Sequence, residues 1–200
     1  MINTRVDDVT RRGTVRLLAG LLAAVAVLGG CASKQEASQS LPSTSAAPST
    51  KALPPLGPKD LPMPAAARTQ DAAGAEAFVR YYIALINRTS TVMDAKPLRD
   101  FSHNCRDCTR IAANTEKDIK AGLHYRHGEL TLTEIAPPLL KDSTAEMALG
   151  AKEAPLEVLN SAGKLVQGRG SGAYTGLSGG AALAWDANRV SWVITDLTIG

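Results

Sequence analysis

The apolar residues near the start of the chain form one uninterrupted run. Residues 17–28 read LLAGLLAAVAVL, and a helix of this length spans only about 18 Å, well short of the ~30 Å hydrocarbon core of a bilayer. The run is therefore too short for a permanent membrane span and has the length of the apolar part of an export signal.

From residue 71 to residue 121 the apolar residues recur at helical spacing. We expect a first helix over residues 71–88, capped by Asp71. Its apolar face consists of Ala75, Phe78, Val79, Tyr82, Leu85 and Ile86. A short helical piece begins at Pro97. A third helix runs from an Asn104 cap to Ala121, and Gly122 ends it.

Beyond residue 122 the pattern changes to the alternation and short apolar runs of strands. The predicted strands are residues 129–135, 145–149, 156–159, 165–166, 181–185 and 190–199, and residues 186–189 (DANR) join the last two as a hairpin. Three helices followed by antiparallel strands predict an α+β domain over residues 67–200.

Residues 31–66, which precede this domain, have a different composition. They are rich in Ser, Ala and Pro and contain no aromatic residue. Such a segment cannot bury enough apolar surface to offset the entropy of ordering it. We therefore expect it to be a disordered tether.

The apolar run ends in the sequence LGGC, residues 28–31, and four arginines precede it. LGGC resembles a bacterial lipobox, whose cysteine is diacylated before cleavage. The resemblance implies a signal peptide over residues 1–30, cleavage after Gly30, and a lipid anchor on Cys31 at the extracytoplasmic face of the cell membrane. An ordinary secretory signal is the alternative. The adjacent Arg11 and Arg12 leave the twin-arginine and general export routes both open.

Removal of residues 1–30 changes the charge of the chain. Its formal charge falls from +3 to +1, with 18 basic and 17 acidic residues remaining. This balance provides no polycation, so we expect no nucleic-acid partner.

Cys105 and Cys108 form a CxxC sequence with three interpretations. A zinc site with His124 and His127 is disfavoured, because the predicted helix would hold the two pairs on the order of 20 Å apart. Redox chemistry would exploit the helix N-terminus, but no βαβ pattern surrounds the motif. We favour a structural disulfide, since Cys31 is acylated and the compartment is oxidising. Cys105 should then lie at the helix edge, in non-helical or strained geometry. We expect no metal and no cofactor.

Residues 168–173 (GRGSGA) match the G-x-G-x-x-A pattern of dinucleotide-binding turns. Strands and turns follow them where a nucleotide fold requires a helix. We interpret this segment as a flexible loop or hairpin connection.

Two segments suggest a fold. The first helix contains AFVRYYIALIN, and the closing hairpin has the form W-D-x-N-x-V-x-W-x-I-x-D-L. Together they resemble the nuclear-transport-factor-2-like cone, in which helices pack on a curved antiparallel sheet around a pocket. The lipobox, the tether, the MPxxA sequence at residues 63–67 and the CxxC sequence look like a family of actinobacterial lipoproteins with an uncharacterised domain.

A cone implies that side chains of the domain line a pocket. Our candidates for ligand binding are Tyr82, Phe101 and Trp192. Enzymes of this fold usually place a carboxylate or a tyrosine in the pocket, and the candidates here are Tyr81, Tyr82, Asp100, Glu157 and Asp196. No motif selects among them, so we assign no catalytic residue. Tyr82 lies on the apolar face of the first helix, where a role in the core is the favoured interpretation.

The expected function is that of a lipid-anchored envelope lipoprotein that binds a small apolar ligand or a protein partner without catalysis. One alternative is an enzyme using acid–base chemistry in the pocket. The other is a thiol–disulfide redox protein acting through Cys105 and Cys108.

The lipobox makes a direct prediction. Labelling of cells with a fatty-acid analogue should mark the protein, and Cys31→Ser should abolish the label, because this thiol is the acylation site. Labelling that persists in Cys31→Ser would refute the anchor.

Overall fold

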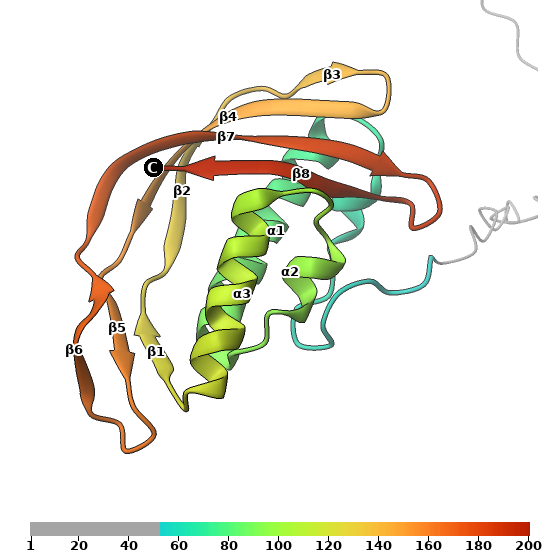
Figure 1. Cartoon of the computed structure of the whole chain (residues 1–200). Helices are drawn as coiled ribbons and strands as arrows, with labels where there is room; N and C mark the ends of the chain where they lie inside the picture. The colour runs from blue at the N-terminus through green and yellow to red at the C-terminus, as the bar shows by residue number, and fades with distance from the viewer. Residues whose placement is uncertain (1–52) are drawn as a thin grey trace, which may run out of the picture. The chain divides into compact units, whose positions relative to one another are not determined.

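The helices of the domain lead into a run of strands, as Figure 1 shows for the computed structural model, which describes residues 53–200. A 3-10 helix, η1 (Ala65–Arg68), precedes α1 (Ala72–Val92), α2 (Lys96–Asp100) and α3 (Arg106–Lys120). The predicted signal peptide and Cys31 lie outside the described residues. Among the residues described, no helix is both long enough and apolar enough to cross a membrane.

The beginnings of α1 and α2 follow from local sequence. The Asp71 carboxylate accepts a hydrogen bond from the Gly74 amide at 2.7 Å, which confirms Asp71 as the cap of α1. The helix ends at Met93, which adopts a left-handed conformation (φ 56°). Pro97 stands in the first turn of α2, where its missing N–H is tolerated.

The beginning of α3 differs from our prediction. Asn104 has a positive φ of 55° and precedes the cap. The cap is Cys105, which has an extended backbone and whose sulfur accepts a hydrogen bond from the Cys108 amide at 3.2 Å. The prediction of Asn104 was wrong by one residue, because the cysteine side chain takes the capping role. Gly122 follows the end of the helix with φ 68°, as expected.

The strands pair antiparallel, as predicted, but they form two sheets. The smaller sheet has the order β1-β5-β6, and the larger has the order β2-β4-β7-β8, with β3 added to β4. The bounds of the strands are β1 (His124–His127), β2 (Leu130–Ile135), β3 (Leu139–Lys141), β4 (Thr144–Glu153), β5 (Leu156–Leu159), β6 (Leu165–Ser171), β7 (Tyr174–Asp186) and β8 (Ser191–Ile199).

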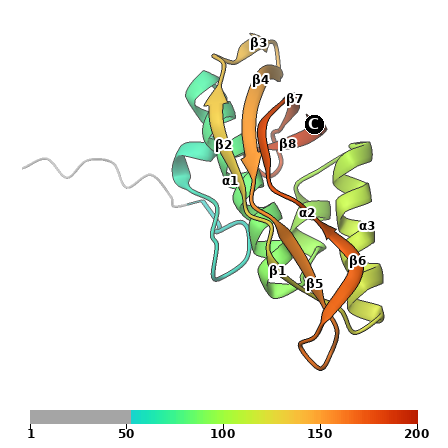
Figure 2. The same cartoon turned by 90° about the vertical axis from the view of Figure 1, so that its left-hand side faces the viewer.

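The larger sheet is curved, and the helices lie on its concave side. Figure 1 shows β7 sweeping around the helical layer, and Figure 2 shows the smaller sheet continuing from the end of β2, β4 and β7. The register shifts between Leu132 and Glu134, between Ala151 and Glu153, and between Ala182 and Leu183. Such bulges bend a strand and increase its twist, which accounts for the curvature.

The hydrophobic core lies between α1 and the larger sheet. Phe78 and Tyr82 of α1, Leu98 of α2 and Trp192 of β8 are fully buried in it. The two polar groups of these side chains are satisfied. The Tyr82 hydroxyl donates to the Leu98 carbonyl at 3.0 Å, and the Trp192 indole N–H donates to the Thr69 carbonyl at 2.9 Å. One face of α1 is therefore committed to this core.

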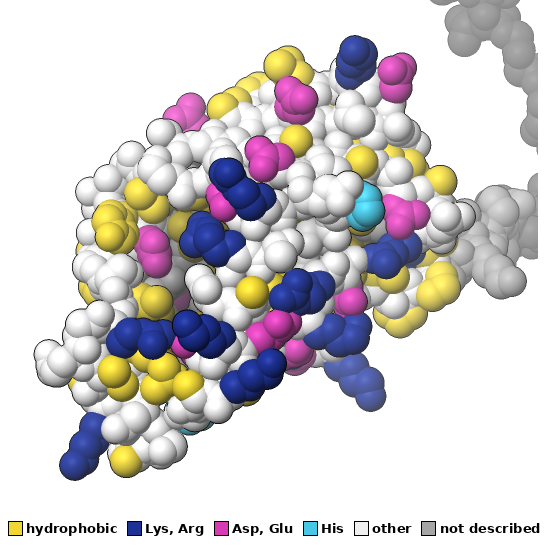
Figure 3. Space-filling view, viewed as in Figure 1, with side chains coloured by type: hydrophobic (Ala, Val, Ile, Leu, Met, Phe, Trp, Pro, Cys, Tyr) yellow, Lys and Arg dark blue, Asp and Glu magenta, His cyan; other side chains and the backbone are white. Residues whose placement is uncertain are grey.

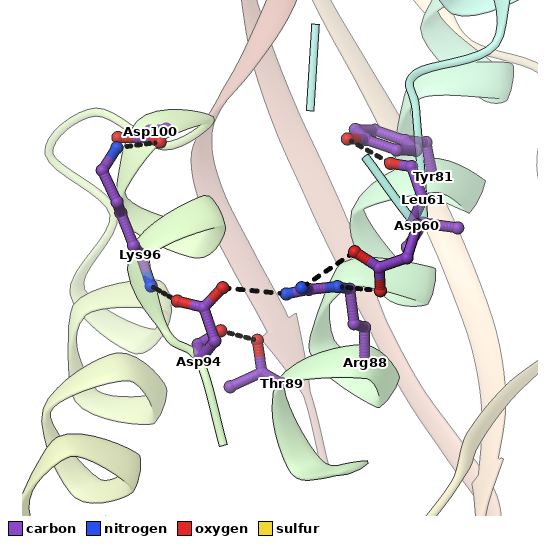
Figure 4. A network of polar contacts seen from close by, with 8 residues as sticks. All are labelled: Asp60, Leu61, Tyr81, Arg88, Thr89, Asp94, Lys96 and Asp100. Carbon is purple, nitrogen blue, oxygen red and sulfur yellow. Dashed lines mark hydrogen bonds and ion pairs between the residues drawn. The ribbon is translucent and has the colours of Figure 1, made fainter. Parts of the chain in front are cut away.

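Residues 53–64, which we assigned to the tether, pack against α1. Met63 is buried and Leu61 contacts the core. Figure 4 shows how Arg88 holds this segment against α1. Its guanidinium donates to both carboxylate oxygens of Asp60, at 2.7 and 3.0 Å, and to Asp94 at 3.0 Å. The Tyr81 hydroxyl also donates to the Leu61 carbonyl at 3.3 Å.

The contact between Arg88 and Asp60 predicts that two arginines of α1 contribute differently to the free energy of unfolding. Arg88→Ala should lower the free energy of unfolding by about 1–2 kcal/mol, because a mostly buried side chain loses its packing and both of its carboxylate partners. Arg80→Ala should cost at most about 0.5 kcal/mol, because its pair with Glu76 is an exposed pair on one helix. Urea denaturation measures both. Equal effects would contradict a role for Arg88 in fixing residues 53–64.

Candidate functional site

A cavity of about 580 Å³ lies between α1, α3 and the two sheets. Its volume falls within the ~300–1,000 Å³ of typical small-molecule sites. Most of the surface of its wall is apolar, and the aliphatic residues in it are Ile86, Ile111, Leu130, Leu156, Leu177, Leu197 and Ile199. In Figure 3 the surface is hollowed beside α3, and both apolar and charged side chains surround the hollow. The core occupies only part of the concave side of the sheet, and the cavity occupies another part.

One face of α3 contributes both apolar and polar side chains to this wall. Asp107, Arg110, Ile111 and Asn114 all line the cavity, and their spacing of three and four residues places them on one side of the helix. Arg110 and Asp107 form an ion pair at 3.3 Å. Much of the charge that α3 brings to the cavity is therefore neutralised within the helix.

Two hydroxyl groups of the cavity wall also have hydrogen-bond partners. The Thr115 hydroxyl donates to the Ile111 carbonyl at 3.1 Å. The Tyr125 hydroxyl donates to Asp118 at 2.7 Å. Burial and this contact raise the pKa of Tyr125 above its usual range. Tyr125 is thus a neutral donor whose proton is already committed.

Glu153 is the exception among the carboxylates near the cavity. It is the last residue of β4, beside the bulge, and it is paired with Leu130 of β2 and Tyr174 of β7. It lines the cavity, and within residues 53–200 its side chain makes no ion pair or hydrogen bond. Desolvation raises its pKa. Glu153 is therefore an available proton donor or acceptor in a largely apolar space.

A second cavity of about 380 Å³, which we call the annex, adjoins the first. It lies between α3 and the smaller sheet and shares Asn114, Tyr125 and Leu156 with the main cavity. Arg169 of β6 donates to both carboxylate oxygens of Asp118, at 2.7 and 2.8 Å. Burial opposes ionisation of Asp118, but the bonds from Tyr125 and Arg169 outweigh it and hold its pKa below its usual range. The annex is polar where the main cavity is apolar.

The structure does not place our ligand-binding candidates at either cavity. Tyr82, Phe101 and Trp192 are 0%, 4% and 1% exposed and belong to the core. Large aromatic side chains fill cores as well as pockets. The prediction that these three residues line a pocket is therefore corrected, because other residues line both cavities.

The acid–base candidates are also elsewhere. Tyr81 is buried against Phe101, Asp100 pairs with Lys96 at 2.6 Å, and Glu157 pairs with Arg126 at 2.5 Å. Neither they nor Asp196 line a cavity. The residue that sequence reasoning missed is Glu153. One signal could have found it, because it continues the inward alternation of buried Ala145, Met147, Leu149 and Ala151.

Cys105 and Cys108 form a disulfide bond, as we expected. Their sulfur atoms lie 2.01 Å apart, and Cys105 has the expected non-helical backbone. Both residues are at most 2% exposed. Exchange with an external thiol would require the start of α3 to open, so this burial favours a structural role.

The remaining motifs form no site. His124 and His127 lie on β1, at the far end of α3 from the cysteines, and the described residues contain no group of three metal-ligating side chains. Residues 168–171 form the end of β6, so most of the GRGSGA segment is strand, and the loop interpretation was wrong for these residues. Gly170 is required there, because a Cβ would lie 2.2 Å from the Leu156 carbonyl oxygen.

Comparisons with known proteins give a distant likeness in fold. No family model and no curated protein sequence matches the chain. The intermembrane space region of the chloroplast protein ARC6 superimposes with a TM-score of 0.47 and 15% identity, covering 66% of this chain and 97% of that one. A variant of a protein named Rd1NTF2_05 has a TM-score of 0.39 and 11% identity, covering 64% and 96%. A distant NTF2-like neighbour is thus found, and no match supports the actinobacterial lipoprotein family.

The desolvation of Glu153 makes a prediction about stability. Its raised pKa means that the folded state holds the proton to a higher pH than the unfolded state does. Stability is therefore lost as the pH rises from the unfolded pKa through the folded pKa. Glu153→Gln should be more stable than the parent protein at pH 7, and this advantage should shrink toward pH 3. Denaturant unfolding at both values measures it, and an advantage independent of pH would contradict the desolvated carboxylate.

Proposed function

We propose that this protein is a lipid-anchored lipoprotein of the cell envelope whose α+β domain binds a small, largely apolar molecule without catalysis. The observation that carries the proposal is the cavity of about 580 Å³ with its aliphatic wall. Transfer of apolar surface from water into such a wall is favourable by about 25 cal/mol per Å². A flat surface for a protein partner would not require this concave space, so the cavity favours the small ligand.

The arrangement of polar groups also supports binding. Asp107 is paired with Arg110, and Tyr125 is bonded to Asp118. Groups that are already paired fix the shape of the wall and add little charge to the interior. Specificity for a largely apolar ligand then depends on shape and on a small number of free polar groups.

The proposed cellular location of the protein rests on its sequence. The lipobox with Cys31 and the Ser/Ala/Pro-rich tether support attachment to the extracytoplasmic face of the cell membrane. The resemblance to actinobacterial lipoproteins supports the same location. A tether would allow the domain to meet ligands at a distance from the bilayer.

Glu153 favours acid–base chemistry on a small molecule as a second candidate function. A desolvated carboxylate with a raised pKa is typical of general acids and bases. Catalysis would also require a group that stabilises the transition state, and the charged or hydroxyl side chains of Arg110, Thr115 and Tyr125 already have partners. A Glu153→Gln variant separates the two functions, because it should retain binding of an apolar ligand and abolish proton transfer.

The cavity predicts binding of a neutral apolar probe. N-phenyl-1-naphthylamine should bind in a 1:1 ratio, and Leu177→Trp should weaken it at least about tenfold, because the larger side chain fills the space. Equilibrium dialysis of the purified protein measures the affinity.

Leu165→Trp is the matched control. Leu165 is exposed on β6 and does not line the cavity, so this variant should bind the probe as the parent does. Absence of 1:1 binding, or an equal loss in both variants, would contradict the proposed function.

A further inference from the structure

The main cavity and the annex meet at three residues with different chemistry. Asn114, Tyr125 and Leu156 line both spaces. On one side of them the wall is aliphatic, and on the other it contains Lys117, Asp118, Arg169 and Ser171. An apolar space beside a polar one matches the two parts of an amphipathic molecule.

The charged groups of the annex leave an excess of donors. Asp118 accepts from Tyr125 and twice from Arg169, so its acceptor capacity is largely used. Lys117 forms no ion pair with any residue of the range 53–200. Two cations and one carboxylate give the annex a net positive charge, which favours a ligand group that is anionic and accepts hydrogen bonds.

Ser171 supplies an independent observation. Its hydroxyl oxygen is buried and has no hydrogen-bond partner among the described residues. Such groups are rare in native proteins, and leaving one unpaired is unfavourable. Ser171 lies on the wall of the annex, next to Gly170 in β6. If the side chain rotates toward the annex, an acceptor on a bound ligand gives this hydroxyl a partner.

We propose that the ligand is an anionic amphiphile: its apolar part fills the main cavity, and its acceptor head group binds in the annex to Lys117, Arg169 and Ser171. The inference rests on the proposed function and specifies the class of ligand. Carboxylate, sulfate and phosphate monoester heads share the required chemistry. Arg169 keeps N–H groups beyond the one that contacts Asp118, so it can serve the carboxylate and the head group together.

Three probes with the same ten-carbon chain test the head group. Decanoate, 1-decanol and decylammonium are titrated calorimetrically into the full chain carrying Cys31→Ser, which has no acyl groups of its own. Decanoate should bind most tightly and decylammonium most weakly. The affinity for decanoate should fall with added salt, because the attraction is between charges.

Two variants in the annex and one control locate the effect. Lys117→Ala should weaken the binding of decanoate about fivefold, which corresponds to the energy of an exposed charge pair. It should leave the binding of 1-decanol unchanged. Ser171→Ala should weaken decanoate and preserve folding, because the hydroxyl has no internal partner to lose. Lys120→Ala removes the same charge from an exposed position on α3 that lines neither cavity, and it should leave decanoate binding unchanged.

The outcomes separate this inference from the proposed function. Equal binding of decanoate and 1-decanol, unaffected by Lys117→Ala, would overturn the anionic head group and leave apolar binding intact. Preference for decylammonium would overturn it as well. If none of the probes binds and N-phenyl-1-naphthylamine does not bind either, the proposed function fails together with the inference.

Discussion

The antiparallel pairing of β4 with β7 is the constraint on which the rest of the domain depends. These two strands form the middle of the larger sheet, and β2 and β8 pair on their outer edges. The register of this pairing shifts between Ala151 and Glu153, where the chain leaves the larger sheet for the smaller one. A bulge bends and twists a strand. Without this bend the sheet would be flatter, and the helices would leave less space for a cavity.

Two groups of side chains divide the space inside the curve. Phe78, Tyr82 and Trp192 fill the part beneath α1 and form the core. The part beside α3 is lined by shorter aliphatic side chains and remains open. The space of about 580 Å³ is open to solvent beside the exposed residues Arg110 and Tyr174. An apolar ligand that enters it removes apolar surface from water.

The polar groups around this space differ in how well they are satisfied. Asp118 holds Tyr125 and Arg169 in place, so α3, β1 and β6 are linked by one buried carboxylate. Glu153 and Ser171 have no such partners in the described part of the chain. Glu153 is partly buried and Ser171 has a buried hydroxyl, and a buried polar group without a partner calls for an explanation, of which a bound ligand is one. Our proposals for the ligand are built on this contrast.

The sequence by itself predicted the elements whose causes are local. Asp71 caps α1, Pro97 opens α2, alternation marks β2 and β4, and the CxxC sequence is a disulfide pair. The lipobox is also a local signal, and the anchor stays a prediction. The site was decided by tertiary structure, because its wall comes from residues as distant in sequence as Ile86 and Leu177. Periodicity shows that Tyr82 and Ile86 share the apolar side of α1, but only the curvature of the sheet decides which meets the core and which meets the cavity.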